Sequence, residues 1–260
     1  LGINPLATDH KVCSFDCLYC ECGWTPALSG KGTHFAPVEV IEEELEAYAR
    51  RGRLSFPRGN IETPAFMPVG TQGTVKGLEI EALRATGAQM ILGNTYHLYL
   101  RPGIPILEQA GGLHAFMGWD RPVLADSGGF QAMSMIRENA RYGTISDGGI
   151  HYRNPDSKRR LRLTPEKVVQ IQFDLGADVM MCLDDCPSPE VDAEGVADSV
   201  RRTVAWARRC KDEFERQVVV RRLGEDERPL LFGIIQGGYD PEQRRQCAEQ
   251  LWPLGFDGYG

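Results

Sequence analysis

Short apolar runs that alternate with helix-like segments constrain this chain more than any other feature of its sequence. Four such runs are MILGN (90–94), PVLA (122–125), VMMCL (179–183) and PLLFGII (229–235). Segments with helical patterning separate or follow them, for example residues 74–89, 196–217 and 240–252. Alternating strands and helices predict an α/β fold with a parallel sheet, and continuous apolar runs are typical of strands buried on both faces.

The ends of two helices can be predicted from their capping residues. Thr164 has the side chain of an N-cap, Pro165 suits the first helical position, and Gly176 is a typical stop. Asp240 followed by Pro241 predicts a second N-terminus of the same kind.

One stretch interrupts the alternation. Asp147-Gly148-Gly149 lies between two β-like runs and predicts a hairpin. The second arm is followed by a basic run of Lys158, Arg159, Arg160 and Arg162. Such a run is typical of a solvated sheet edge, and it is also what a phosphate-binding surface requires.

The charge is distributed unevenly along the 260 residues. The whole chain carries 29 basic and 36 acidic residues, a net charge of −7. Residues 1–48 hold two lysines and eight acidic residues, so 2 − 8 = −6, which leaves 27 − 28 = −1 for residues 49–260. This step predicts two units, 1–48 and 49–260. No apolar run approaches the ~20 residues of a membrane helix, and no secretory signal opens the sequence, so we expect a cytoplasmic protein.

Three cysteines dominate the first unit. Cys13, Cys17 and Cys20 have the spacing C-x3-C-x2-C, which can wrap a metal or cluster and leave one coordination position open. A zinc loop completed by Cys22 or His10 is the alternative, and a disulfide is disfavoured in a protein without a secretion signal.

These cysteines, with Tyr19 before the third, resemble the signature of radical S-adenosylmethionine enzymes. The resemblance covers about residues 1–48 and implies a 4Fe-4S cluster bound by Cys13, Cys17 and Cys20, with S-adenosylmethionine on the fourth iron. It does not extend to the barrel that such an enzyme needs, so we interpret this segment as a fragment or fused leader.

Polar residues follow each apolar run of the second unit. They are Thr95, Tyr96 and His97; Asp126 to Gln131; Asp184, Asp185 and Cys186; and Gln236, Gly237 and Gly238. A single aspartate in such a place is often only an N-cap, but four polar strand ends in series predict a site at one edge of the sheet.

The chemistry of these residues suits a purine. A buried carboxylate can accept both N–H groups of a guanine-like edge, and an amide such as Gln236 can serve its carbonyl. Phe130 or Tyr96 could stack on the base, while Gly128 and Gly129 let the backbone approach a ligand closely. The residues therefore predict a pocket for an extruded purine.

Five blocks of residues 49–260 resemble the tRNA-guanine transglycosylases (queuine tRNA-ribosyltransferases). The blocks are ETPAFMPVGTQGTVKGL, ILGNTYHLYLRPG, LADSGGFQ, GADVMMCLDDCP and LFGIIQGG, in that order. The resemblance implies a (β/α)8 TIM-type barrel, incomplete because its last strands are missing, preceded by the short cysteine-motif segment. It also implies exchange of guanine in a tRNA anticodon for a 7-deazaguanine base.

The resemblance assigns roles to individual residues. Asp126 matches the acid/base carboxylate, and with Ser127, Gly128, Gly129 and Phe130 it would line the base pocket. Asp184 would bind the edge of the base, Gln236 its carbonyl, and Gly237 would contact it as well. Asp185 stands where bacterial members have glutamate in a DEC motif; here the motif is DDC, with Cys186.

The resemblance also implies parts that this chain lacks. The nucleophilic aspartate and the zinc site of three cysteines and a histidine would lie beyond residue 260, so we expect base binding without complete exchange. Expected partners are a tRNA anticodon loop, the 7-deazaguanine base and a second subunit, in a homodimer or heterodimer. A non-catalytic partner subunit and a radical S-adenosylmethionine enzyme are the alternative functions.

Overall fold

The computed structural model describes residues 52–153 and 160–260. The chain divides into two compact units, Leu1–Arg53 with Glu62–Pro64, and Leu54–Ile61 with Ala65–Gly260. The three cysteines of the predicted cluster lie outside the described residues, and the boundary at residues 48 and 49 stays a prediction. β1 (Gly52–Phe56) and β2 (Gly59–Thr63) form a two-stranded sheet. The elements described below belong to the second unit.

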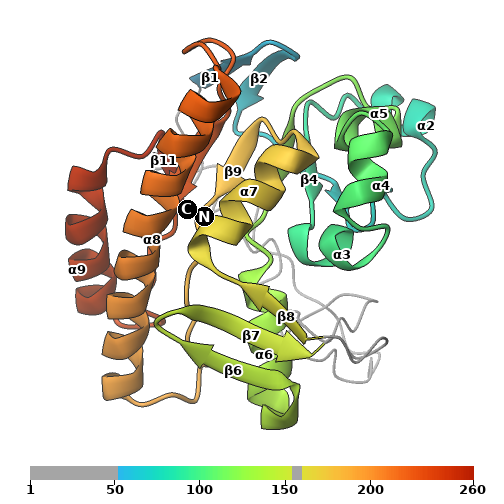
Figure 1. The fold of residues 1–260 in the computed structure, drawn as a ribbon. Coiled ribbons are helices and arrows are strands. Elements are labelled where there is room, and N and C mark those ends of the chain that lie inside the picture. The colour runs from blue at the N-terminus through green and yellow to red at the C-terminus, as the bar shows by residue number, and fades with distance from the viewer. Residues whose placement is uncertain (1–51, 154–159) are drawn as a thin grey trace, which may run out of the picture. The chain divides into compact units, whose positions relative to one another are not determined.

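A six-stranded parallel sheet forms the centre of the second unit, which confirms the predicted α/β class (Figure 1). Its order is β11-β10-β9-β5-β4-β3, and every neighbouring pair is parallel. The strands are β3 (Val69–Gly70), β4 (Ile91–Gly93), β5 (Val123–Ala125), β9 (Val179–Met181), β10 (Leu230–Gly233) and β11 (Gly258–Tyr259). Because the strands run in one direction, their carboxyl ends meet at one edge of the sheet.

The long helices follow the predicted caps. α7 (Pro165–Leu175) begins after Thr164, whose Oγ1 accepts the Lys167 N–H at 3.2 Å, and ends at Gly176 with a φ of 72°. α9 (Pro241–Leu251) begins after Asp240, which accepts two backbone N–H groups. α8 (Ala193–Arg221) has 29 residues and exceeds the predicted 196–217 at both ends.

The remaining helices are shorter. They are α2 (Ile80–Ala85), α3 (Thr95–Leu100), α4 (Ile104–Gln109), α5 (Leu113–Met117), α6 (Gly129–Glu138) and the 3-10 turns Ala140–Tyr142 and Trp252–Leu254. The helix predicted over 74–89 is wrong at both ends, because Gly77 and Gly87, with φ of 77° and 81°, lie on either side of a helix that spans only Ile80–Ala85. None of the helices in the described ranges is long and apolar enough to cross a membrane.

The predicted hairpin is confirmed and extended into a three-stranded antiparallel sheet. Its strands are β6 (Gly143–Ser146), β7 (Gly149–Arg153) and β8 (Arg160–Leu163). Ser146 pairs with Gly149 across a turn of Asp147 and Gly148. Alternate residues of β7 and β8, Ile150, Tyr152 and Leu163, are buried and face the core.

Candidate functional site at the strand ends

Asp126 follows β5 and is held by groups from two helices. Its Oδ1 accepts the backbone N–H of Thr95, at the start of α3, at 2.7 Å. Its Oδ2 accepts Nε2 of Gln131, on the first turn of α6, at 3.3 Å. The carboxyl group is therefore fixed at the carboxyl end of the sheet, where the sequence predicts the site.

The same surroundings change the acidity of Asp126. Burial raises its pKa from 3.8 to about 6, against the lowering effect of hydrogen bonds from Thr95, Gln131 and the Gly128 backbone, and the nearby charge of Asp184 adds to the rise. A carboxyl group with a pKa of about 6 can both accept and return a proton near neutral pH, as an acid/base catalyst must.

Gly128 and Gly129 bring the chain close to its neighbours after Asp126. Gly128 has a φ of 71°, and a Cβ there would lie 2.7 Å from the Tyr96 nitrogen. A Cβ on Gly129 would lie 2.5 Å from Cδ1 of Leu183. Ser127 is buried, and its Oγ accepts the Gly129 N–H at 3.3 Å. A side chain at Gly128 would clash with the backbone of Tyr96, and one at Gly129 would require the Leu183 side chain to move.

Asp184 and Gln236 meet at the ends of β9 and β10. Nε2 of Gln236 donates to Oδ2 of Asp184 at 2.6 Å, and both side chains are buried, with 6% and 9% of their surface exposed. The Gln236 backbone N–H donates to Sγ of Cys247 at 3.3 Å. Gly237 follows with a φ of 144°, and a Cβ there would lie 2.5 Å from the Arg244 nitrogen. A carboxylate and an amide are thus presented side by side.

Two buried polar atoms beside Asp126 have no hydrogen-bond partner among the described residues. They are Oγ1 of Thr95 and Oε1 of Gln131. Buried polar groups are nearly always satisfied, so this hydroxyl and this amide oxygen are two groups that a ligand beside Asp126 could bind.

The two aromatic candidates have different surroundings. Tyr96 is 4% exposed, packs against the Tyr152 ring at 5.4 Å between centroids, and donates its hydroxyl to Sδ of Met135 at 3.5 Å. It is a core residue, so its predicted role in stacking on a base is wrong. Phe130 keeps part of its surface exposed and remains the stacking candidate.

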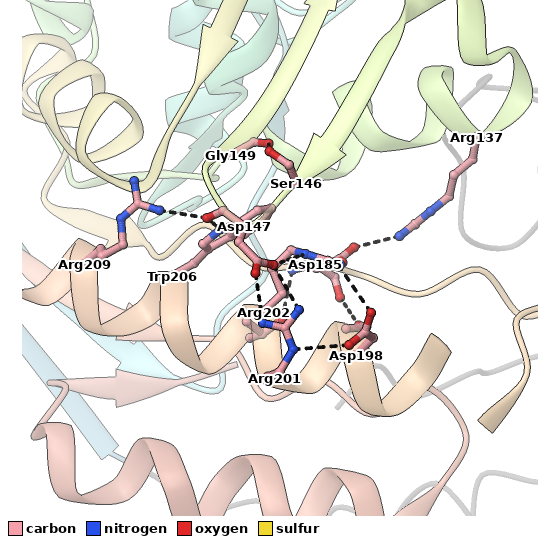
Figure 2. A network of polar contacts seen from close by, with 12 residues as sticks. Arg137, Ser146, Asp147, Gly149, Asp185, Asp198, Arg201, Arg202, Trp206 and Arg209 are labelled. Atoms are coloured by element: carbon pink, nitrogen blue, oxygen red, sulfur yellow. Dashed lines mark hydrogen bonds and ion pairs between the residues drawn. The ribbon is translucent and has the colours of Figure 1, made fainter. Parts of the chain in front are cut away.

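Asp185 lies among arginine side chains (Figure 2), whereas its neighbour Asp184 contacts Gln236. Its carboxylate is 3% exposed and lies between two arginines, with Nη2 of Arg137 on α6 at 2.8 Å and Arg202 on α8 as the second ion pair. Its backbone N–H donates to Oγ1 of Thr203 at 2.9 Å, and Oγ of Ser199 donates to its carbonyl. Asp185 therefore joins α6, α8 and the end of β9.

The same network holds the hairpin turn. Arg201 binds the Asp147 carboxylate through both terminal nitrogens, at 3.0 and 3.2 Å, and Nε of Arg202 adds a third contact at 3.3 Å. Trp206 and Arg209 donate to the Asp147 carbonyl at 2.9 and 3.0 Å. The sequence pattern did not identify Arg137 or Arg202 as partners of Asp185, because they lie 48 and 17 residues away from it in the chain.

The acidity of Asp126 predicts how stability depends on pH. The unfolded chain loses this proton near pH 3.8 and the folded chain near 6. The folded state therefore binds the extra proton between these values, and stability falls as the pH rises from 3.8 to about 6. Removing the charge with Asp126→Asn should stabilise the protein above pH 7 by up to about 3 kcal/mol, at 1.36 kcal/mol per pKa unit, and change little below pH 4. Urea unfolding at pH 4 to 8 measures this, and a constant difference across that range would contradict it.

The fold and site define an α/β protein with a buried carboxylate, a half-buried carboxylate of raised pKa, an amide and paired glycines at the carboxyl edge of a parallel sheet. The sequence model of one family, described as queuine tRNA-ribosyltransferase, matches residues 45–260. The chain belongs to this family, which confirms the resemblance of its five sequence blocks.

Curated relatives carry the same name. The queuine tRNA-ribosyltransferase of Halothermothrix orenii is 47% identical over 222 residues, and that of Shouchella clausii is 50% identical over 221. The protein of that name from Shewanella baltica is 50% identical over 221 residues. These alignments cover 84–85% of this chain, and the chain spans about 55% of the length of each relative.

Proposed function

We propose that this chain is the base-binding part of a tRNA-guanine transglycosylase, which replaces guanine in a tRNA anticodon by a 7-deazaguanine base. The observation that carries the proposal is the buried pair of Asp184 and Gln236, next to Asp126 with its pKa of about 6. The family assignment and the name of the relatives support it.

The pair can recognise a guanine-like edge. The two oxygens of Asp184 would accept the ring N–H and the exocyclic amine. Gln236 would turn its amide N–H from Asp184 to the base carbonyl, which replaces one hydrogen bond by another. The exposed part of Phe130 would cover the base, and the glycines at 128, 129 and 237 would leave it room.

Exchange requires a nucleophile in addition. In the whole protein an aspartate beyond residue 260 would attack the anomeric carbon of the ribose, and the bond from that carbon to guanine would break with its electrons going to guanine. The leaving base would take a proton from Asp126. The incoming base would then attack the same carbon, the bond to the aspartate would break with its electrons returning to that carboxylate, and Asp126 would accept the proton that the incoming base loses.

The remaining predictions for the whole protein are proposals of the same kind. The parallel sheet would be part of a (β/α)8 barrel. A zinc ion would bind outside the described residues, among which there is no group of three or more side chains that could hold a metal. The 4Fe-4S cluster at Cys13, Cys17 and Cys20 precedes the region matched by the family and remains a prediction.

Selectivity among purines tests the proposal. In a calorimetric titration of the 260-residue chain at pH 7.5, guanine should bind best. Hypoxanthine lacks the exocyclic amine and should bind about 10- to 100-fold more weakly, since one charge-assisted hydrogen bond contributes roughly 1.5–3 kcal/mol. Adenine presents a donor where Gln236 would donate and should not bind measurably. Equal affinity for adenine and guanine, or no binding of guanine, would overturn the proposal.

A further inference from the structure

The outer face of the antiparallel sheet carries positive charge. In register, His151 of β7 lies opposite Arg162 of β8, and Arg153 opposite Arg160. All four side chains are exposed, while their neighbours Ile150, Tyr152 and Leu163 face the core. We call His151, Arg153, Arg160 and Arg162 the basic sheet face.

This arrangement is unfavourable for the protein alone. Like charges directly opposite one another on adjacent strands are destabilising. The three strands contain no aspartate or glutamate, and none of the three arginines forms an ion pair with a described residue. Some arginines elsewhere in the unit are paired, for example Arg209 with Glu166, while Arg222 has no ion pair among the described residues. The direct opposition of Arg153 and Arg160, which no described acidic residue neutralises, therefore favours an anion from outside.

A groove runs along the outer strand of this face. It has a volume of about 490 Å³, and its lining includes Tyr99, Arg160, Arg162 and Lys167. Glu166 also lines it, but both oxygens of its carboxylate accept hydrogen bonds from Arg209, at 2.7 and 2.9 Å. Three cations and an aromatic ring along one groove suit a nucleic-acid strand, whose phosphates are regularly spaced negative charges.

The basic sheet face is fixed relative to the base site. The hairpin turn at Asp147 is bound to Arg202, Arg202 is paired with Asp185, and Asp185 directly follows Asp184 (Figure 2). On the inner side, Tyr152 of β7 packs on Tyr96, one residue from the Thr95 N–H that binds Asp126. A nucleic-acid strand bound to the basic sheet face would therefore keep a constant position relative to the base site.

We propose that the basic sheet face, with Lys167, binds the phosphate backbone of the RNA whose base enters the pocket. This inference rests on the proposed function and adds the surface that holds the RNA. Arginine forks bind phosphate oxygens in two-point contacts, and such contacts position a nucleic acid without reading its sequence.

A triple variant, Arg153→Gln/Arg160→Gln/Arg162→Gln, tests the proposal. Fluorescence anisotropy would follow binding of a tRNA anticodon stem-loop between 50 and 200 mM salt. We expect at least about tenfold weaker binding at low salt, and a slope of log affinity against log salt that is smaller by about two to three, near one for each phosphate that the variant no longer neutralises. A charge-matched triple, Arg58→Gln/Arg222→Gln/Arg245→Gln, should bind like the wild type.

Guanine titration separates this inference from the proposed function. If the first triple variant binds guanine normally and RNA weakly, the proposal is supported. If the wild type binds guanine but not the stem-loop, or if both triples lose RNA affinity equally, the basic sheet face is not the RNA site, although the base pocket stands. Binding to phosphatidylserine vesicles tests the other source of phosphate groups. If the first triple variant loses vesicle binding but keeps its RNA binding, the proposal is overturned in favour of a membrane surface.

Discussion

Replacing Asp184 by asparagine should weaken guanine binding by at least about 100-fold. The substitution removes one of two acceptors and places an N–H donor opposite a donor of the base. A site built to hydrogen-bond a ligand rejects the mismatched arrangement strongly, because buried polar groups are left unpaired. Calorimetric titration of wild type and variant with guanine at the same pH measures the effect.

A matched substitution separates this effect from a general loss of structure. Asp192→Asn makes the same chemical change at the N-cap of α8, where Asp192 accepts the Gly195 N–H at 2.9 Å and asparagine caps equally well. It should leave guanine affinity and stability unchanged. Asp184→Asn should also fold normally, because asparagine has the same shape and keeps a carbonyl oxygen that can accept the Gln236 amide. Equal guanine affinity in Asp184→Asn and the wild type would exclude Asp184 from base recognition.

Replacing Asp185 by asparagine should destabilise the protein by about 3 kcal/mol. The substitution leaves Arg137 and Arg202 around a neutral side chain that is almost fully buried. Breaking a buried ion pair by removing one partner typically costs 3–5 kcal/mol, because the remaining charge is desolvated without compensation. Arg202 keeps its contacts with Asp147 and Asp198, and Arg137 is 30% exposed to water, so the lower end of the range applies. Urea unfolding at pH 7 measures the difference.

Asp198 supplies the control for that prediction. Its carboxylate contacts Arg201 at 3.2 Å and Arg202 at 3.7 Å, but 57% of its side chain is exposed. Exposed ion pairs contribute between 0 and about 1 kcal/mol, so Asp198→Asn should change the free energy of unfolding by less than that. Similar losses in Asp185→Asn and Asp198→Asn would show that burial does not set the importance of Asp185.

Several elements could be predicted because their determinants are local. The caps at Thr164 and Asp240 and the stop at Gly176 lie within one turn of the groups that they satisfy. Residues 103–117 show the limit of such patterns. They carry a partly helical pattern, but Gly111 and Gly112, with φ of 88° and 93°, divide them into α4 and α5.

The candidate site could be placed but not assembled from the sequence. Strand-end position predicted Asp126, Asp184 and Gln236, and the structure brings Asp184 and Gln236 into contact. The same rule placed Tyr96 and Asp185 at the candidate site together with these residues. Tyr96 instead packs in the core, and Asp185 binds arginines of α6 and α8. The direction in which a polar strand-end side chain points depends on helices that come from distant parts of the sequence.

By itself the sequence determined the parallel sheet, the hairpin at Asp147, the edge at which polar residues gather and the family to which the chain belongs. Each follows from periodicity or from motifs a few residues long. Only the tertiary structure decided that Asp126 has a pKa of about 6, that Asp185 is buried between two arginines, and that Arg153 and Arg160 face each other without a counter-charge among the described residues. Burial and charge pairing depend on distances between residues far apart in the chain, and folding alone sets those distances.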